Sequence, residues 1–416
     1  MQIAKEKTYP TNNERQTRRM EELYDLYKAV YEKPKRITFL IGNGFDLSCG
    51  LKSSYTDMYE GYVNSISNSP TIAQFKDRIQ ADIATWADFE MKMCDYMKEF
   101  SDEREFLECL HDFRNYMTEH LRSEEKKFRK KLNKRLKERV QVVVYESLFD
   151  ICHIAFPDER DSQVRFSVIC FNYTSVVDLV LVNPRVSEIV HVHGTLSDSP
   201  VMGVNDEGQF GSAIPYPITD DIKTEYVKPV FNQEYDQVRD EKAMNMIRNS
   251  DAICVFGMSL GASDKRWVEA LADWHNTHWK DKLIIFDYGC YAKSDHKATN
   301  IRNAKKARQS LACKANWSRI NEVEFEIQKP IFDFSFLLDE KLNIKKMKFR
   351  CIISCVWFLM SVCSIFALLL LKTHNIIVPP ISILILCLGL FSYSLIASCV
   401  FFSYSVSKLL ASKPRD

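Results

Sequence analysis

An apolar strand that stops at two closely spaced glycines is the sequence feature that most constrains the fold. Residues 36–41 are rich in β-branched and aromatic side chains, and Gly42 and Gly44 follow them directly. Glycine lets the backbone turn sharply, and a helix start beyond it offers unpaired N–H donors. The pattern predicts a strand–turn–helix unit of the kind that binds phosphate in α/β proteins. Leu47 replaces the third glycine of the dinucleotide fingerprint and no P-loop lysine follows, so a turn without a ligand is the alternative.

Four further apolar runs predict the rest of a sheet. They lie at residues 164–171, 188–193, 252–256 and 283–286. Continuous apolar runs are typical of strands buried on both faces, and helical segments between them indicate a doubly wound parallel sheet. Ligands bind beyond the carboxyl ends of such strands. The polar residues at these ends are Asn43, Asp46, Asn172, His193 and Ser259.

A long, mostly helical region is expected between the first two strands, from residue 53 to 148. Its section 126–139 is strongly basic, with Phe128, Leu132 and Leu136 at every fourth position. We interpret this section as a helix whose charges cover its solvent face, and a nucleic-acid or anionic-lipid patch is the alternative. The net charge of the chain is +1, so no global field favours nucleic acid.

Cysteine usage and the histidines give no sign of a metal site. The 13 cysteines form no CxxC pair, which fits free thiols in a reducing cytosol. His275 and His278 are three residues apart, but Trp267, Leu271 and Trp274 make that stretch look like a packed helix. The N-terminal residues 1–34 lack a secretory signal and are expected to form a leading helix with an apolar side.

The C-terminal residues predict a membrane hairpin. Residues 351–371 carry no charge and as a helix would span about 31 Å, and a second uncharged stretch runs to residue 404. Lysines and arginines flank the pair at 336–350 and 405–416, which places both ends and the α/β part (35–335) in the cytoplasm. A soluble apolar hairpin is the alternative.

Five motifs occur along the chain in a recognisable order. They are residues 41–47 with 50–55, the Trp86–Glu90 segment, residues 171–174, residues 191–194, and residues 257–260 with Asp264. In this order they resemble the AbiH family of bacterial proteins linked to abortive phage infection, a branch of the sirtuin-like α/β proteins. The resemblance covers roughly residues 36–290 and implies a Rossmann-like sheet with a large helical insertion. Met258 departs from the histidine that the family usually carries, and the zinc module of deacetylating sirtuins is absent.

The resemblance implies NAD as substrate or ligand, with no metal. Asn172 would hold the ribose or the attacking water and His193 would be the general base, although His191, two residues earlier on the same strand face, is an alternative. The residues expected to bind the cofactor are Gly42, Asn43, Gly44, Phe45, Asp46, Ser259 and Asp264. The other expected partners are inner-membrane lipids, a phage-derived or host trigger and further copies of the chain, and nucleic acid is not required.

Two functions follow from these expectations. In the first, the protein is a membrane-anchored NAD hydrolase that acts on infection. In the second, the α/β domain senses a nucleotide without cleaving it, and the hairpin at 351–404 disrupts the inner membrane. Small residues in the hairpin, which permit close helix packing, favour the second function. Deletion of the residues after about Phe349 distinguishes the two, because only a hydrolase keeps its NAD cleavage.

Overall fold

The computed structural model divides the chain into two compact units, Met1–Asp333 and Phe334–Asp416. In the second unit the structure describes Phe334 and α14 (Ser335–Leu338). The expected leading helix apart from Met20, residues 86–88 of the tryptophan motif and the expected hairpin at 351–404 lie outside the described residues. No helix in the described part is long and apolar enough to span a bilayer. The structure describes residues 20, 34–80, 89–157, 164–198, 200–211, 213–234, 238–278, 281–286, 297–325 and 331–338.

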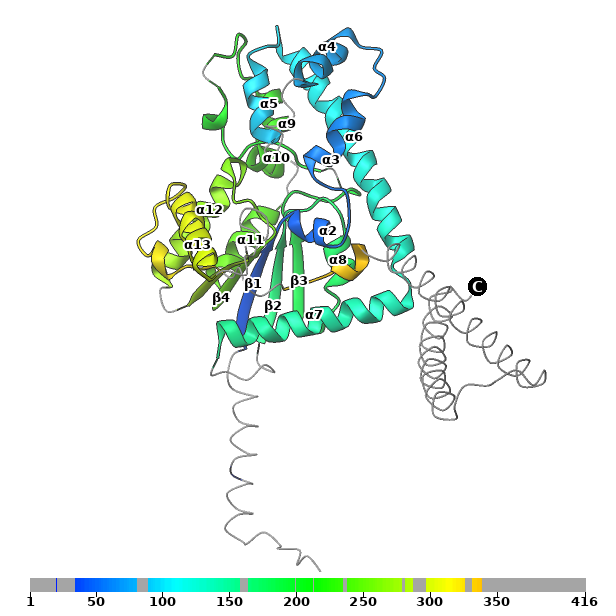
Figure 1. Ribbon diagram of the computed structural model, residues 1–416. Coiled ribbons are helices and arrows are strands. Elements are labelled where there is room, and N and C mark those ends of the chain that lie inside the picture. The colour runs from blue at the N-terminus through cyan, green and yellow to red at the C-terminus, as the bar shows by residue number, and fades with distance from the viewer. Residues whose placement is uncertain are drawn as a thin grey trace, which may run out of the picture. The chain divides into compact units, whose positions relative to one another are not determined.

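The first unit is built on a sheet of six parallel strands, which confirms the predicted α/β class. The order across the sheet is β3-β2-β1-β4-β5-β6, so the chain moves outward from β1 in one direction and then returns to continue in the other (Figure 1). The carboxyl ends of β1 and β4 therefore form a topological switch point, where α/β proteins bind ligands. The strands are β1 (Lys35–Ile41), β2 (Val164–Cys170), β3 (Val186–His191), β4 (Ala252–Phe256), β5 (Lys282–Phe286) and β6 (Glu324–Phe325).

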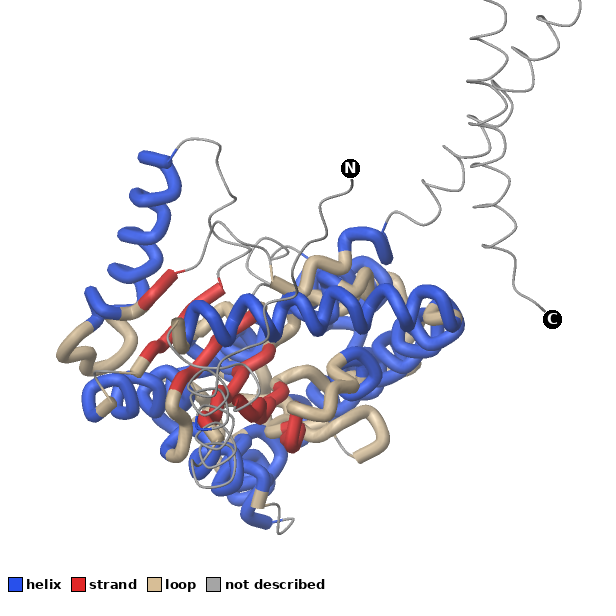
Figure 2. The backbone as a smooth tube through the Cα atoms, turned by 90° about the horizontal axis from the view of Figure 1, so that it is seen from below, coloured by secondary structure: helices blue, strands red, loops and turns tan. Residues whose placement is uncertain are grey.

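Helices cover both faces of the sheet (Figure 2). On one face Leu40 and Ile253 pack with Trp267 and Leu271, in a core shared by α11 (Arg239–Arg248), α12 (Lys265–Thr277) and α13 (Lys297–Ala312). On the other face Phe332 packs edge-on against Phe39, with 5.8 Å between ring centroids. The Phe332 N–H donates to Ser147 Oγ of α7 (Lys134–Ala155) at 2.8 Å. The sheet is doubly wound, as its continuous apolar runs predicted.

A second core lies beyond the carboxyl edge of the sheet, and we call the helices around it the helical lobe. The rings of Phe89 and Phe113 pack against each other in this core at an interplanar angle of 34°, with 3.9 Å between centroids. Local signals start its helices: Ser54 and Asp57 form a capping box, and Pro70 follows the N-cap Ser69. The lobe comprises α3 (Tyr55–Val63), α4 (Pro70–Ile79), α5 (Phe89–Met97), α6 (Glu103–Lys131) and α9 (Asp220–Tyr226).

Short helices lie in the connections between these larger elements. They are α2 (Gly44–Ser48), α8 (Val176–Val180), α10 (Lys228–Glu234), η3 (Glu207–Gln209), η4 (Ala262–Asp264) and η5 (Ile320–Glu322).

The basic section 126–139 forms two helices, so its interpretation as one helix is wrong. α6 ends at Lys131, and α7 begins at Lys134 behind the N-cap Asn133, whose Oδ1 accepts the Leu136 N–H at 3.0 Å. Phe128, Leu132 and Leu136 are nevertheless all buried. The apolar spacing predicted which residues are buried. The turn between α6 and α7 depends instead on a single capping asparagine.

A buried ion pair joins the helical lobe to the sheet edge. Glu90 of α5 accepts from Lys228 Nζ of α10 at 2.8 Å, and both side chains are under a tenth exposed. Glu90 Oε1 also accepts from the Tyr173 hydroxyl at 3.4 Å and from the Gly203 N–H at 3.3 Å. Tyr173 follows β2, so one carboxylate ties α5 and α10 to the carboxyl end of a central strand.

The Lys228→Met substitution is expected to destabilise the protein by about 3–5 kcal/mol, because it leaves the Glu90 charge buried without its cation. The Glu90→Gln/Lys228→Met double variant should recover most of that loss, since glutamine keeps an acceptor for Tyr173 and Gly203. Chemical denaturation of the two variants measures this. Equal losses in the single and double variants would show that the pair is not energetically coupled.

Candidate functional site

A buried carboxylate lies where β1 and β2 end. Asp46 is on α2, directly after the glycine turn, and is 1% exposed. Its Oδ1 accepts from Asn172 Nδ2 at 2.9 Å and its Oδ2 from Thr174 Oγ1 at 2.6 Å. Because β1 and β2 are parallel neighbours, the turns that follow them meet at one edge of the sheet. Two residues that the sequence singled out, Asp46 and Asn172, are thus in direct contact.

Burial raises the pKa of Asp46 to about 7, against the opposing effect of the hydrogen bonds from Thr174 and Asn172. The nearby charge of Glu125 raises that pKa further. Glu125 reaches this region from α6, where its Oε2 accepts the Ser175 N–H at 2.9 Å. The Asp46 carboxyl can therefore gain or lose a proton near neutral pH, a property that a catalytic acid or base needs.

Only the nitrogen of the Asn172 side-chain amide makes a hydrogen bond among the described residues. Its Nδ2 donates to Asp46, while its Oδ1 is buried without a hydrogen-bond partner among the described residues. A buried acceptor left in this state costs free energy, and such groups in native proteins call for an explanation. The contact with Asp46 fixes the direction of the amide and leaves its oxygen available to a hydroxyl or water donor.

The two histidines do not share a strand face, so that expectation is wrong. β3 ends at His191, and His193 lies in the turn beyond it, where strand alternation no longer applies. The His191 ring reaches Asp178, with 2.8 Å between Nε2 and Oδ2. Burial opposes the charged form of His191, but the hydrogen bonds and charges of Asp178 and Cys170 together outweigh burial and raise the pKa of His191 to about 11.

His193 lies next to the Asn172 backbone. Its ring packs edge-on against Phe171 at 5.4 Å and tilts against Tyr173 at 6.2 Å, and these are the two residues that flank Asn172. Burial and then the charge of Lys228 hold the pKa of His193 well below its usual range. The imidazole is therefore neutral at physiological pH, the form that accepts a proton.

The glycine turn packs against the turn that follows β4. The N–H groups of Gly42 and Gly44 donate to the carbonyl oxygens of Phe256 and Gly257, at 2.9 and 2.8 Å. Gly257 has a φ of +68°. A Cβ on Gly44 would lie 2.5 Å from the Gly257 Cα, so the two backbones touch. This approach accounts for glycine at both positions, and a role of Gly42 and Gly44 in binding the cofactor stays a prediction.

Asn43 and Phe45 have partners within the fold. Asn43 Nδ2 donates to the Ser53 carbonyl oxygen at 3.0 Å, and Ser53 Oγ donates to Asn43 Oδ1 at 2.5 Å. These bonds hold the loop that leads to α3. Phe45 is fully buried and packs edge-on against Phe256 and Phe332, with 6.1 and 5.7 Å between ring centroids. Both residues support the turn that carries Asp46.

Ser259 and Asp264 lie in the loop after β4, one strand away from β1. Ser259 is exposed, and the next residue, Leu260, has a φ of +48°. Asp264 closes η4 and is partly buried. They share the carboxyl edge with Asp46, and their part in nucleotide binding stays a prediction.

Sequence reasoning missed Thr174, Glu125 and Lys228 as parts of this edge. Thr174 belongs to the motif at 171–174, and its position two residues after Asn172 is the sequence signal that could have assigned it to the site. Glu125 and Lys228 come from distant helices and carry no local pattern that points to the site.

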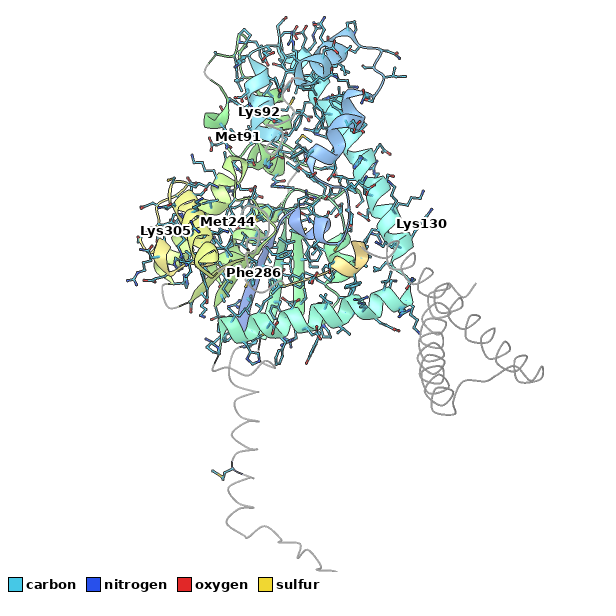
Figure 3. All side chains as sticks on the ribbon, viewed as in Figure 1. Met91, Lys92, Lys130, Met244, Phe286 and Lys305 are labelled. Carbon is cyan, nitrogen blue, oxygen red and sulfur yellow. The ribbon has the colours of Figure 1, made fainter. Side chains whose placement is uncertain are left out.

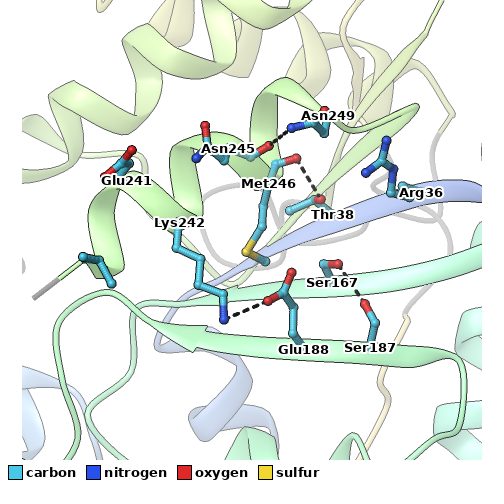
Figure 4. Close-up of a pocket in the computed structure, with 11 residues that line it drawn as sticks. Arg36, Thr38, Ser167, Ser187, Glu188, Glu241, Lys242, Asn245, Met246 and Asn249 are labelled. Atoms are coloured by element: carbon cyan, nitrogen blue, oxygen red, sulfur yellow. Dashed lines mark hydrogen bonds and ion pairs between the residues drawn. The ribbon is translucent and has the colours of Figure 1, made fainter.

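A cavity of about 540 Å³ lies elsewhere, between α11 and the first halves of β1, β2 and β3. Figure 4 shows that Lys242 and Glu188 form an ion pair in its wall, 2.9 Å apart, and that Ser167 and Thr38 contribute hydroxyls. The cavity contains none of the predicted site residues. We place the candidate site at the carboxyl edge because the hydrogen-bonded carboxylate and the neutral imidazole lie there.

No group of three or more metal-ligating side chains occurs within the described ranges. The His275 ring contacts the Arg319 carbonyl oxygen at 3.3 Å, and His278 stacks on Trp274 with 5.2 Å between ring centroids. Both histidines thus have structural partners, in agreement with the packed helix that was expected.

The Gly44→Ala substitution is expected to destabilise the protein by about 2–4 kcal/mol, because the new methyl group meets backbone atoms that cannot move aside. The matched control is Gly211→Ala, whose Cβ would meet only the Cys94 carbonyl oxygen at an ordinary 3.9 Å. Thermal unfolding of both variants measures the difference. A Gly44→Ala protein as stable as the control would contradict the close approach of the two turns.

The candidate site and the sheet, apart from β6 and the first residues of β1, fall within one family match. Residues 38–286 match the model of the family described as bacteriophage abortive infection AbiH. The match spans 249 of the 416 residues and includes Asp46, Asn172 and His193. The comparison with curated proteins gives no match. Because the family model covers more than half of its length, the chain belongs to the bacteriophage abortive infection AbiH family.

Proposed function

We propose that this protein is an antiphage effector that binds NAD, or a related nucleotide, at the carboxyl edge of β1, β2 and β4 and hydrolyses its nicotinamide–ribose bond on infection. Membership of the AbiH family supports the role in abortive infection. The observation that carries the chemistry is the buried cluster of Asp46, Asn172 and Thr174, in which the Asp46 pKa lies at about 7.

The reaction needs a polarised water and a stabilised sugar cation. Nicotinamide leaves with the electron pair of the glycosidic bond, the water oxygen bonds to the ribose carbon, and one proton of that water passes to a base while the other stays on the new hydroxyl group. In this proposal neutral His193 accepts that proton, and the unpaired Asn172 Oδ1 accepts a hydrogen bond from the ribose hydroxyl or the water. Asp46, which the Thr174 hydroxyl holds in place, fixes the amide and supplies negative charge near the developing cation.

The burial of these groups implies a closed site. Asp46, Asn172 and His193 are 1, 5 and 8% exposed. A nucleotide reaches them only if the helical lobe moves away from the sheet edge, and the Glu90–Lys228 pair lies across that junction. Such closure excludes bulk water, as cleavage through an oxocarbenium-like state requires. In this proposal the infection trigger acts by opening the lobe.

We also propose that residues 351–404 anchor the protein in the bacterial inner membrane, with the α/β unit in the cytoplasm. The two uncharged stretches and the basic residues around them support this. A second candidate function follows from the closed site, which suits a sensor as well as an enzyme. The α/β unit would then bind the nucleotide without cleaving it and would control membrane disruption by the hairpin.

His193→Ala and Asn172→Ala are each expected to abolish NAD loss in phage-infected cells, while the wild type depletes NAD before the membrane depolarises. The loss of the base or of the ribose contact should lower the rate of NAD hydrolysis by about 10²–10⁴-fold. His278→Ala, on a partly buried histidine at the end of α12, is the matched control and should behave as the wild type. NAD assays with a membrane-potential dye distinguish the two functions, since depolarisation with NAD intact would support the sensor.

Asp46→Asn should abolish NAD loss and yet stabilise the fold at alkaline pH. In the wild type the unfolded carboxyl ionises near pH 4 and the folded one near pH 7, so the free energy of unfolding falls as the pH rises between these values. The variant lacks that fall and should gain up to about 4 kcal/mol over the wild type above pH 7. Denaturation at pH 4, 6 and 8 measures this, and parallel profiles for the two proteins would contradict the raised pKa.

A further inference from the structure

The outer face of α7 carries an apolar stripe that is open to solvent. Val142, Tyr145 and Phe149 are 56, 58 and 40% exposed and follow one another at helical spacing. The opposite side of the same helix is buried through Val140, Val144, Leu148 and Ile151. An amphipathic helix normally has a polar outer face, so apolar residues on both sides indicate a second packing surface. We call these three exposed residues the α7 stripe.

The charges on α7 oppose its own dipole. Its first half exposes Lys134, Arg135, Lys137 and Arg139 against Glu138, a net charge of +3, and its second half carries Glu146 and Asp150, a net charge of −2. Cations near a helix N-terminus and anions near a C-terminus are unfavourable. Lys130 and Lys131 at the end of α6 add positive charge next to the start of α7, and Figure 3 labels Lys130.

Several of these charges have no ion-pair partner among the described residues. In the part of the chain that the structure describes, Lys134, Arg135, Lys137 and Glu146 make no ion pair, and all four are exposed. A partner that lies along α7 with an acidic segment near its start and a basic segment near its end would neutralise both halves. A second α7 in the antiparallel direction has that charge distribution.

We propose that two copies of this chain associate through antiparallel packing of their α7 helices about a two-fold axis near Tyr145. The α7 stripe of one copy then packs on that of the other, and each basic half lies along an acidic half. The interface is isologous, so one set of residues serves both sides. α7 has 22 residues and is about 33 Å long, which gives the apolar stripe charged contacts at both ends.

The same charges argue against an anionic membrane as the occupant of this face. A helix that lies in a bilayer surface keeps its cations on the polar face and its apolar face free of acids. Glu146 follows Tyr145 directly, and Asp150 follows Phe149. Both acids would be brought to the lipid headgroups and repelled, whereas in the antiparallel pair they lie near the cations of the partner helix.

The first test uses two differently tagged copies of the full chain, co-expressed and solubilised in detergent. Wild-type copies should co-purify, and Tyr145→Asp/Phe149→Asp should reduce the co-purified fraction by about tenfold, because the new charges meet each other across the axis. The control is Ile66→Asp, an apolar residue 96% exposed on the helical lobe, which should co-purify as the wild type. Undiminished co-purification of the stripe variant would overturn the proposal.

The second test reverses the charges of α7 and leaves the α7 stripe unchanged. Arg135→Glu/Lys137→Glu makes both halves of α7 acidic, and Glu146→Lys/Asp150→Lys makes both halves basic. Each variant should fail to pair with itself, and the two together should co-purify as well as wild-type copies do. This rescue also rules out misfolding as the cause of the losses. Failure of the mixed pair to exceed either variant alone would overturn the antiparallel arrangement.

Lipid binding is measured on the same proteins with vesicles of phosphatidylcholine and phosphatidylglycerol. The proposal expects the α7 stripe variant to bind these vesicles as the wild type does, since its change affects only the contact between copies. A variant that loses vesicle binding and keeps co-purification would assign the stripe to the membrane and would overturn the proposal.

Discussion

The fold depends on the contact between two backbone turns, one after β1 and one after β4. Gly44 and Gly257 lie so close that neither position has room for a Cβ atom, and their hydrogen bond joins the two strand ends. This contact sets the start of α2 and therefore the place of Asp46. A loop with ordinary side chains would separate the turns and move the carboxylate away from Asn172. The glycines thus act on the site through the position of the strands.

Much of the sheet could be predicted, because strands buried on both faces leave continuous apolar runs in the sequence. The runs at 164–171, 252–256 and 283–286 correspond to β2, β4 and β5 within a residue. Two expectations failed where a local feature overrode the pattern. Asn133 caps a new helix within the basic section, and β3 ends before His193. Periodicity reports which side chains are buried and is a poor guide to where an element ends.

The site was predictable in part for a similar reason. Asp46 and Asn172 each follow a parallel strand, so topology alone brings them to one edge. Thr174 as a partner of Asp46 is visible only in three dimensions. The Glu90–Lys228 pair joins residues 138 positions apart, and neither has a local pattern that points to the other. Contacts of this range come from the packing of the helical lobe on the sheet, which no short motif encodes.

The long insertion has a consequence for the synthesis of the protein. Lys35 of β1 pairs with Val164 of β2, 129 positions later, so β1 must wait until the helices from α3 to α7 have left the ribosome. Sheets with such distant pairings fold slowly. Asp46 comes before these helices and Asn172 after them, so an unfinished chain contains only half of the cluster. A chain that ends before residue 172 therefore has Asp46 without its amide partner, and the hydrogen-bonded pair forms only once the sheet is assembled.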